Sequence, residues 1–167
     1  MNAIEIIPEL SILIVSYNTR QMTLDCLRTL YDGLGDLAVE VFVVDNASAD
    51  GTPAAVRAAF PQAQLIENDR NVGFGAANNQ AMAQAQGEFF LLLNSDAFPK
   101  PGAIGTLVAY LQSHPDTGVV GPRLLNADGT LQKSCYRFPS PAQVWRDNIG
   151  ISSVASHRSR LGDYRHW

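Results

Sequence analysis

Residues 39–52 read VEVFVVDNASADGT, and this stretch decides the fold class. It opens with Val39–Val44, a mostly apolar stretch that predicts a buried strand. The run turns polar at Asp45, and Thr52-Pro53 then offers an N-cap followed by proline in the first helical turn. A buried strand followed closely by a helix indicates a βαβ unit, and therefore a parallel sheet.

The same alternation of strand and helix extends in both directions from this stretch. The other predicted strands are 11–16 (SILIVS), 64–67, 88–93 (EFFLLL) and a short fifth strand at 119–120. The first predicted helix follows Thr19, a candidate N-cap. The other predicted helices cover 52–60, 76–85 and 102–113. The pattern predicts an α/β fold in which helices flank a mostly parallel sheet. A turn at 126–129 then predicts a hairpin.

The composition is that of an ordinary globular domain, with 167 residues, 46% hydrophobic and 17% charged. It excludes a collagen-like or wholly disordered chain. The longest apolar run, Phe89–Leu93, is far too short to span a bilayer. The N-terminal MNAIEIIPEL has no basic start, so we expect no secretory signal and a cytoplasmic protein. Cys26 and Cys135 are expected to be reduced thiols.

The net charge of −4 hides an asymmetry along the chain. Residues 1–122 carry 13 acidic and 5 basic residues, whereas residues 123–167 carry 3 acidic and 7 basic residues. The basic stretch is either a solvated surface or a contact with phosphates or an anionic leaflet. Nucleic acid is not an expected partner, because no nucleic-acid-binding motif is present and the domain as a whole is acidic.

Polar residues follow each of the first four predicted strands, where ligands bind in open α/β sheets. Each cluster alone is compatible with ordinary turn formation, but four at one edge favour a binding site. The candidates are Ser16, Tyr17, Asn18, Asp45, Asn71, Gly73, Asn94 and Asp96. Asp45 can accept hydrogen bonds from a base or sugar. Asp96 is a hard oxygen ligand suited to Mg²⁺ or Mn²⁺.

Taken together, four motifs in order resemble glycosyltransferase family 2: SILIVSYN, VVDNASADGT, NVGFGAANN and FFLLLNSD. The later stretch PRLLNADGTLQKSCYRFPSP is similar to the branch that contains bacterial rhamnosyltransferases. The resemblance implies a GT-A nucleotide-sugar-binding fold, a three-layer α/β/α arrangement. It also implies a GT-A core at 1–141 and an incomplete acceptor-side region at 142–167, so that the fold is truncated.

The resemblance also implies a role for each candidate residue. In such enzymes the end of the first strand and the Asp after the second hold the nucleobase, here Tyr17, Asn18 and Asp45, with the backbone of Ser16. The Asn-x-Gly segment, Asn71 and Gly73, lies beneath the ribose and phosphates. The Asp-x-Asp motif brackets ribose and metal, and its last position is Asp96, the expected ligand of a divalent cation. Its first position is Asn94, which can bind a ribose hydroxyl but brings no charge.

The implied reaction transfers a sugar from a nucleoside diphosphate sugar to an acceptor hydroxyl, with inversion. A dTDP sugar such as dTDP-rhamnose is expected first and a UDP sugar next. The implied acceptor is a growing cell-surface polysaccharide, with a lipid-linked acceptor and a peripheral place on the inner membrane face as further expectations. No carboxylate beyond Asp116 lies in a motif matching the family's general base, so no base is assigned.

Two other functions are weighed against this one. A non-catalytic nucleotide-binding or interaction module of the same fold is favoured by Asn94 and by the missing base, and opposed by Asp45 and Asp96. A Rossmann dehydrogenase needs its glycine-rich loop after the first strand, where this chain has Ser16–Arg20, SYNTR. The dehydrogenase is therefore the weakest of the three hypotheses.

Overall fold

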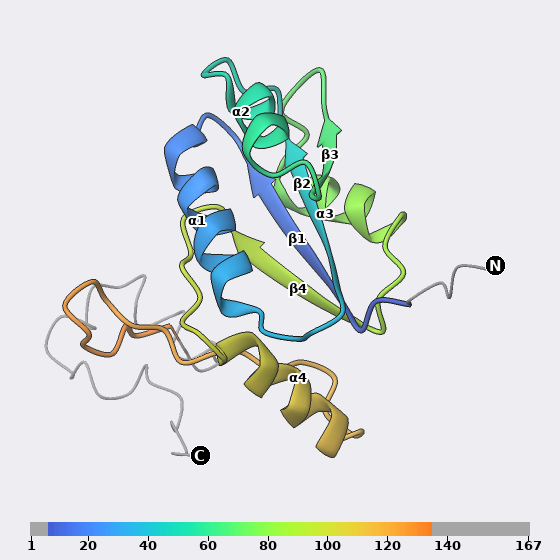
Figure 1. Ribbon diagram of the computed structural model, residues 1–167, viewed down its shortest axis with the longest axis vertical. Helices are drawn as coiled ribbons and strands as arrows, with labels where there is room; N and C mark the ends of the chain where they lie inside the picture. The colour runs from blue at the N-terminus through green and yellow to red at the C-terminus, as the bar shows by residue number, and fades with distance from the viewer. Residues whose placement is uncertain (1–6, 135–167) are drawn as a thin grey trace, which may run out of the picture. The chain divides into compact units, whose positions relative to one another are not determined.

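The computed structural model describes residues 7–134, which divide into two compact units, 7–120 and 121–134. The first unit alternates strands and helices along the chain (Figure 1). Its elements are β1 (Leu10–Ser16), α1 (Arg20–Gly33), β2 (Val39–Asp45), α2 (Thr52–Ala59), β3 (Gln64–Glu67), α3 (Phe74–Met82), β4 (Phe89–Asn94) and α4 (Ala103–Ser113). The predicted α/β class is therefore confirmed.

The four strands form one parallel sheet in the order β3-β2-β1-β4. β1 is central: Ser16 is in register with Asp45 of β2, and Val15 with Asn94 of β4. Asp45 is in turn paired with Glu67 of β3. Because all strands run the same way, their carboxyl ends lie along one edge of the sheet.

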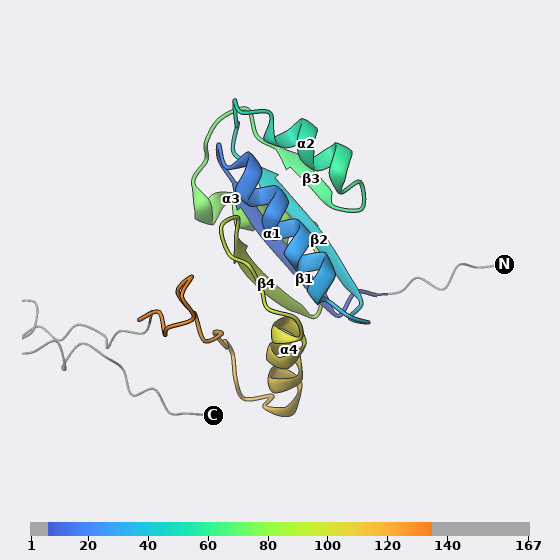
Figure 2. The ribbon, with the colours of Figure 1, turned by 60° about the vertical axis from the view of Figure 1, so that its left-hand side comes forward.

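Helices cover both faces of the sheet, which gives the expected three layers (Figures 1 and 2). On one face Val41 and Val43 pack in a core with side chains of α1, α2 and α4. On the other face Phe42 and Val44 pack against Ala77 and Ala81 of α3. The alternation of β2 side chains between two apolar cores explains why the run at 41–44 is continuously apolar.

The core on the α3 face covers a narrower part of the sheet than the core on the other face, because α3 packs against β1 and β2. Phe90 and Leu92 of β4 point away from the first core and remain 47% and 48% exposed. β4 is also an edge strand of the described sheet.

Three sequence predictions need correction. The short strand at 119–120 is absent, and Val119 is 88% exposed, because no strand partner lies beside it. Thr52 is not the N-cap of α2 but its first helical residue, and Gly51 occupies the cap with φ 80°. The helix predicted from Ala76 begins earlier, at Phe74, and ends at Met82.

The described part of the second unit, residues 121–134, contains the predicted hairpin. Leu125 and Leu131 form an antiparallel bridge around a turn in which Gly129 N donates to Asn126 O at 2.9 Å. The expected domain boundary after Pro141, the 142–167 region and Cys135 lie outside the described residues. Within residues 7–134 no helix is both long and apolar enough to cross a membrane.

Candidate functional site

The site is built on the carboxyl edge of the sheet, where three neighbouring strands end in polar residues. Ser16 and Asp45 are direct partners in the ladder, and Asn94 pairs with the residue before Ser16. The edge places these three predicted residues together, with Tyr17, Asn18 and Asp96 in the segments that follow. Asn71 and Gly73 follow β3 in the segment that leads into α3.

Asp45 is the most unusual residue at this edge. It is 1% exposed, and its Oδ2 accepts a hydrogen bond from Ser48 N at 2.8 Å. Its Oδ1 is buried and has no hydrogen-bond partner among the described residues. A buried carboxylate oxygen without a donor is costly, so a ligand N–H, a hydroxyl or a water must satisfy it. Because Oδ1 is out of solvent contact, neighbouring groups must shift to admit a ligand larger than water.

Asn18 clamps the loop after β1 to the loop after β2. Its N–H donates to Ser48 Oγ at 2.8 Å, and its Oδ1 accepts from Ala49 N at 2.8 Å. The side-chain oxygen is thus occupied, and the Nδ2 group is left as the polar atom that can meet a ligand. Ser48 contacts both Asn18 and Asp45, so it links the two predicted base-binding residues.

The backbone of these loops is strained. Asn18 has φ 53° and Ala47 has φ 64°, a region that L-residues other than glycine and asparagine rarely adopt. Such strain persists where surrounding contacts hold it, and it is frequent at binding sites. Tyr17, between Ser16 and Asn18, is 50% exposed and offers a flat ring to the same edge.

The glycine-rich segment forms the start of α3. Asn71 Oδ1 accepts from Gly73 N at 2.9 Å, and Gly73 is the N-cap residue with φ 84° and ψ 163°. No atom lies within 4 Å of a Cβ built on Gly73, so the backbone angles, and not lack of space, require glycine here. On α3 itself Asn78 is 3% exposed, with an Oδ1 that also lacks a described partner.

Asn94 is the last residue of β4, and Asp96 lies in the turn that follows. The turn is closed by Ala97 N donating to Asn94 O at 3.0 Å, and Cys26 Sγ of α1 lies 3.6 Å from the same carbonyl oxygen. Burial and the negative charge of Asp96 raise the pKa of the Cys26 thiol to about 12. The thiol therefore stays protonated, and the Asp96 carboxylate lies near α1.

Asp96 is the candidate ligand of a divalent cation. Its side chain is exposed and has no hydrogen bond to a described residue. Residues 7–134 contain no cluster of three or more His, Cys, Asp or Glu side chains able to hold a metal. The residues fit a Mg²⁺ or Mn²⁺ ion that takes Asp96 as one ligand and completes its shell with water and phosphate oxygens.

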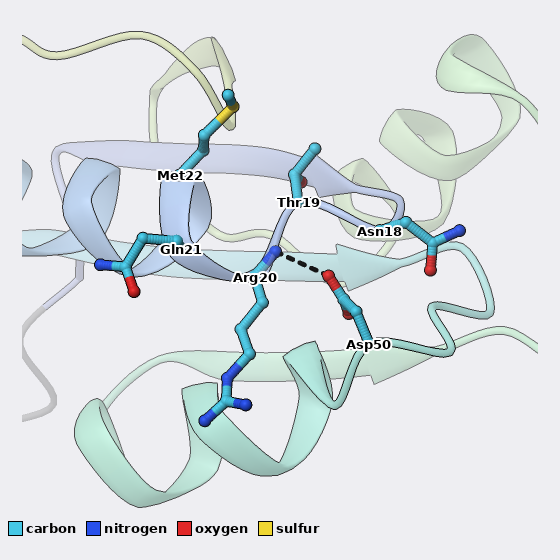
Figure 3. A pocket seen from close by; sticks show the side chains of 6 residues that line it. All are labelled: Asn18, Thr19, Arg20, Gln21, Met22 and Asp50. Carbon is cyan, nitrogen blue, oxygen red and sulfur yellow. Dashed lines mark hydrogen bonds between the residues drawn. The ribbon is translucent and has the colours of Figure 1, made fainter.

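A shallow hollow of about 300 Å³ lies at the start of α1, beside this edge (Figure 3). Arg20 N donates to Asp50 Oδ2 at 2.9 Å across it. Asp50 Oδ1 also accepts from Thr52 N and Thr52 Oγ1, at 3.0 and 2.5 Å. The hydroxyl of Thr52 and these backbone N–H groups lower the pKa of Asp50. Asp50 is therefore the residue that ties the starts of α1 and α2 together.

Sequence reasoning missed Ser48, Ser95 and the true role of Thr19. Thr19 is the N-cap residue of α1, but its side chain makes no capping bond and instead contacts other hydroxyls. The spacing of Thr19 and Thr23, one helical turn apart beside a strand end, was a signal that the chain offered. Ser48 gave no such signal, because its partners come from two different loops.

The comparisons with known proteins agree on one family. The family model of glycosyl transferase family 2 matches residues 11–152. An N-acetylglucosaminyl-diphospho-decaprenol L-rhamnosyltransferase of Mycobacterium tuberculosis is 32% identical over 113 residues, 61% of this chain and 37% of the relative. The succinoglycan biosynthesis protein ExoO of Rhizobium meliloti is 34% identical over 107 residues, 64% of this chain and 30% of the relative. The chain thus spans about a third of the length of these relatives.

Solved structures agree with the fold. The mannosyltransferase PcManGT of Pyrobaculum calidifontis, in complex with GDP-Man and Mn²⁺, is 32% identical, with a TM-score of 0.58 over 62% of this chain and 32% of that one. TarS 1–349 of S. aureus, in complex with UDP, is 26% identical, with a TM-score of 0.57 over 64% of this chain and 33% of that one. The fold is the GT-A fold expected from the motifs, and the chain belongs to glycosyltransferase family 2.

Proposed function

We propose that this chain is the donor-binding part of a glycosyltransferase that moves a sugar from a nucleoside diphosphate sugar to an acceptor hydroxyl. One observation carries the proposal: Asp45, at the carboxyl edge, has a buried oxygen without a donor. The imide N–H of uracil or thymine is a donor of the required kind. Membership of the family and the solved relatives with GDP-Man or UDP support the same site.

In this proposal Asp45 accepts the base N–H while Asn18 offers its Nδ2 to a base carbonyl. Tyr17 stacks on the base, and Ser16 contributes its backbone to the same site. The ribose and phosphates extend toward Asn71 and Gly73, and Asn94 binds a ribose hydroxyl. Asn18 is given this role through its Nδ2, because its Oδ1 already accepts from Ala49 N.

Asp96 would hold a divalent cation together with the diphosphate. When bound, the cation offsets the negative charge that develops on the leaving diphosphate. The acceptor oxygen attacks the anomeric carbon from the opposite face, the bond to the diphosphate breaks, and the configuration inverts. The acceptor proton passes to a base that we do not assign to a residue of this chain.

The donor we propose is a dTDP sugar, dTDP-rhamnose in particular, with UDP sugars next. The similarity to an L-rhamnosyltransferase and to a succinoglycan biosynthesis protein supports this order and a surface-polysaccharide acceptor. The decaprenol in the first relative's name supports an acceptor carried on a lipid. A cytoplasmic protein bound peripherally to the inner membrane face fits such an acceptor, and the excess of basic residues after 122 supports it.

Calorimetric titration with dTDP, UDP, GDP and NAD tests the proposal, each with and without MnCl₂. We expect dTDP or UDP to bind, and Mn²⁺ to strengthen binding in the wild type but not in Asp96→Asn. Asp116→Asn is the matched control, since Asp116 is exposed and lies after α4, away from the carboxyl edge. Binding of NAD alone, or of none of the four, would contradict the proposal.

A non-catalytic nucleotide-binding module is the second candidate, because Asn94 leaves Asp96 as a single carboxylate in the turn. The two candidates differ in whether Mn²⁺ strengthens nucleotide binding and in whether the donor loses its sugar. A module binds the nucleotide with an affinity that Mn²⁺ does not change, and it releases no sugar from its donor. A transferase site gains affinity with Mn²⁺.

A further inference from the structure

Four hydroxyl groups form a cluster that joins three parts of the carboxyl edge. Ser16 ends β1, Thr19 and Thr23 open α1, and Ser95 lies in the turn after β4. Ser16 Oγ lies 3.0 Å from Thr19 Oγ1 and 2.9 Å from Thr23 Oγ1. Thr19 Oγ1 lies 3.2 Å from both Thr23 Oγ1 and Ser95 Oγ. Thr23 Oγ1 also donates to the Thr19 carbonyl at 2.9 Å.

Counting protons limits how these contacts can be bonded. Each hydroxyl has one proton, and that of Thr23 is used on the Thr19 carbonyl. Three protons then remain for four contacts between hydroxyl oxygens, so three of the four can be hydrogen bonds at once. One such order has Ser16 donating to Thr23, Thr19 to Ser16 and Ser95 to Thr19. In either direction, the bond between Thr19 and Ser95 joins the turn after β4 to the start of α1.

The cluster lies between the two carboxylates of the proposed site. Ser16 is the ladder partner of Asp45, and Ser95 immediately precedes Asp96. Two side-chain hydrogen bonds among the described residues tie this turn to the N-cap and helix of α1: Thr19 with Ser95, and Cys26 with the Asn94 carbonyl. The thiol contact is 3.6 Å long and is made by a weak donor. The bond between Thr19 and Ser95 is thus the stronger of the two.

We propose that Thr19 and Ser95 are positioning residues that hold Asp96 at a fixed place relative to Asp45. The base and the cation-bound diphosphate of one nucleotide then bind together without a cost for ordering the turn. The inference rests on the proposed function, because it concerns how that site couples its two halves. Neither residue touches the nucleotide in this account.

Titration of UDP and dTDP, in EDTA and in excess MnCl₂, tests the pair in four variants. In Thr19→Val and in Ser95→Ala we expect the Mn²⁺-dependent gain in affinity to fall roughly tenfold, as one hydrogen bond warrants. Affinity in EDTA should stay within about twofold of the wild type. The double variant should be no worse than either single one, because both remove the same bond. Thr19→Ser, which keeps the hydroxyl, should restore the gain.

The outcomes separate this inference from the proposed function. If the wild type gains affinity with Mn²⁺ and Ser95→Ala gains as much, the positioning role is overturned while the nucleotide site stands. If the effects of the two single variants add in the double variant, the pair does not act as a unit and the inference is wrong. A wild type that binds neither nucleotide overturns both. Ser95→Ala removes one contact in a turn, so it keeps the test decisive if Thr19→Val unfolds.

Discussion

Strand β2 carries a carboxylate near each end, and the two are treated in opposite ways. Glu40, at the amino end, accepts from Ser11 Oγ at 2.6 Å, Gln86 N at 2.5 Å, Gly87 N at 3.2 Å and Gln64 Nε2 at 3.2 Å. Asp45, at the carboxyl end, accepts from Ser48 N, while its other oxygen is buried without a partner. The amino end is saturated and holds the fold together. At the carboxyl end, Asp45 Oδ1 remains an acceptor that no donor among the described residues uses, as a binding site requires.

The difference extends to the backbone around each carboxylate. At the amino end Gly87 packs so closely that an added Cβ would lie 2.5 Å from Ser11 Oγ and 2.6 Å from Ser11 N. At the carboxyl end Asn18 and Ala47 adopt positive φ angles. Close packing at one end and strain at the other suggest that substitutions will act mainly on stability at the first and mainly on binding at the second.

The largest expected effect is that of Gly87→Ala. The new methyl group meets the backbone and side chain of Ser11, which cannot retreat from a buried central strand. We expect a loss of about 3 kcal/mol or more in the free energy of unfolding, measured by urea denaturation. The matched control is Gly75→Ala in α3, where no atom lies within 4 Å of the added Cβ. It should be neutral or stabilise by up to about 1 kcal/mol. Equal effects of the two would contradict the close packing.

Glu40→Ala should cost about 2 kcal/mol at neutral pH, because it removes the acceptor of several bonds, including the one from the buried Ser11 hydroxyl. Burial alone would raise the pKa of Glu40, but the bonds from Ser11, Gln86, Gly87 and Gln64 outweigh it and hold the pKa below its ordinary value of 4.5.

The sign of the pH dependence follows from that lowered pKa. Stability from Glu40 is fully present above the unfolded value of 4.5 and is lost as pH falls through the lower, folded value. The difference in unfolding free energy between wild type and Glu40→Ala should therefore shrink below pH 4.5. A difference that stays constant down to the acid transition would show that the carboxylate charge plays no part.

The smallest expected stability change is that of Ala47→Gly. Ala47 is held at φ 64°, which glycine adopts without strain, so relief in the folded state competes with the extra freedom of the unfolded chain. We expect Ala47→Gly to raise the free energy of unfolding, measured by urea denaturation, by about 0.5 kcal/mol. Gly51→Ala, at φ 80° with its nearest atom 3.9 Å from an added Cβ, is the control and should destabilise by about 1 kcal/mol. Destabilisation by both changes would argue against strain at Ala47.

Much of this architecture follows from local sequence patterns. Short stretches of strand length predicted all four strands, and topology then placed Ser16, Asp45 and Asn94 along one edge. The prediction of a strand at 119–120 was wrong, because two valines without a neighbouring strand form no ladder.

The finer features of the site depend on tertiary contacts that no local pattern contains. That Asp45 Oδ1 lacks a donor depends on the path of the following loop, which delivers a single N–H from Ser48. That Thr19 bonds sideways to Ser95, 76 positions along the chain, depends on β1 and β4 being neighbours. Composition and periodicity do not report which of several oxygens is left unpaired.

The central claim is that Asp45 Oδ1 accepts a hydrogen bond from a nucleobase. Titration of Asp45→Asn tests this claim most directly. Asparagine replaces one carboxylate oxygen with an NH₂ group, so if its oxygen keeps the bond from Ser48 N, the position that faces the ligand is a donor and no longer an acceptor. The wild type and the variant should each be titrated with UDP and with ribose 5-diphosphate, which lacks the base. The account predicts UDP binding about tenfold weaker in the variant, with ribose 5-diphosphate binding unchanged. Equal UDP affinity in the two proteins, or an equal loss for both ligands, would contradict it.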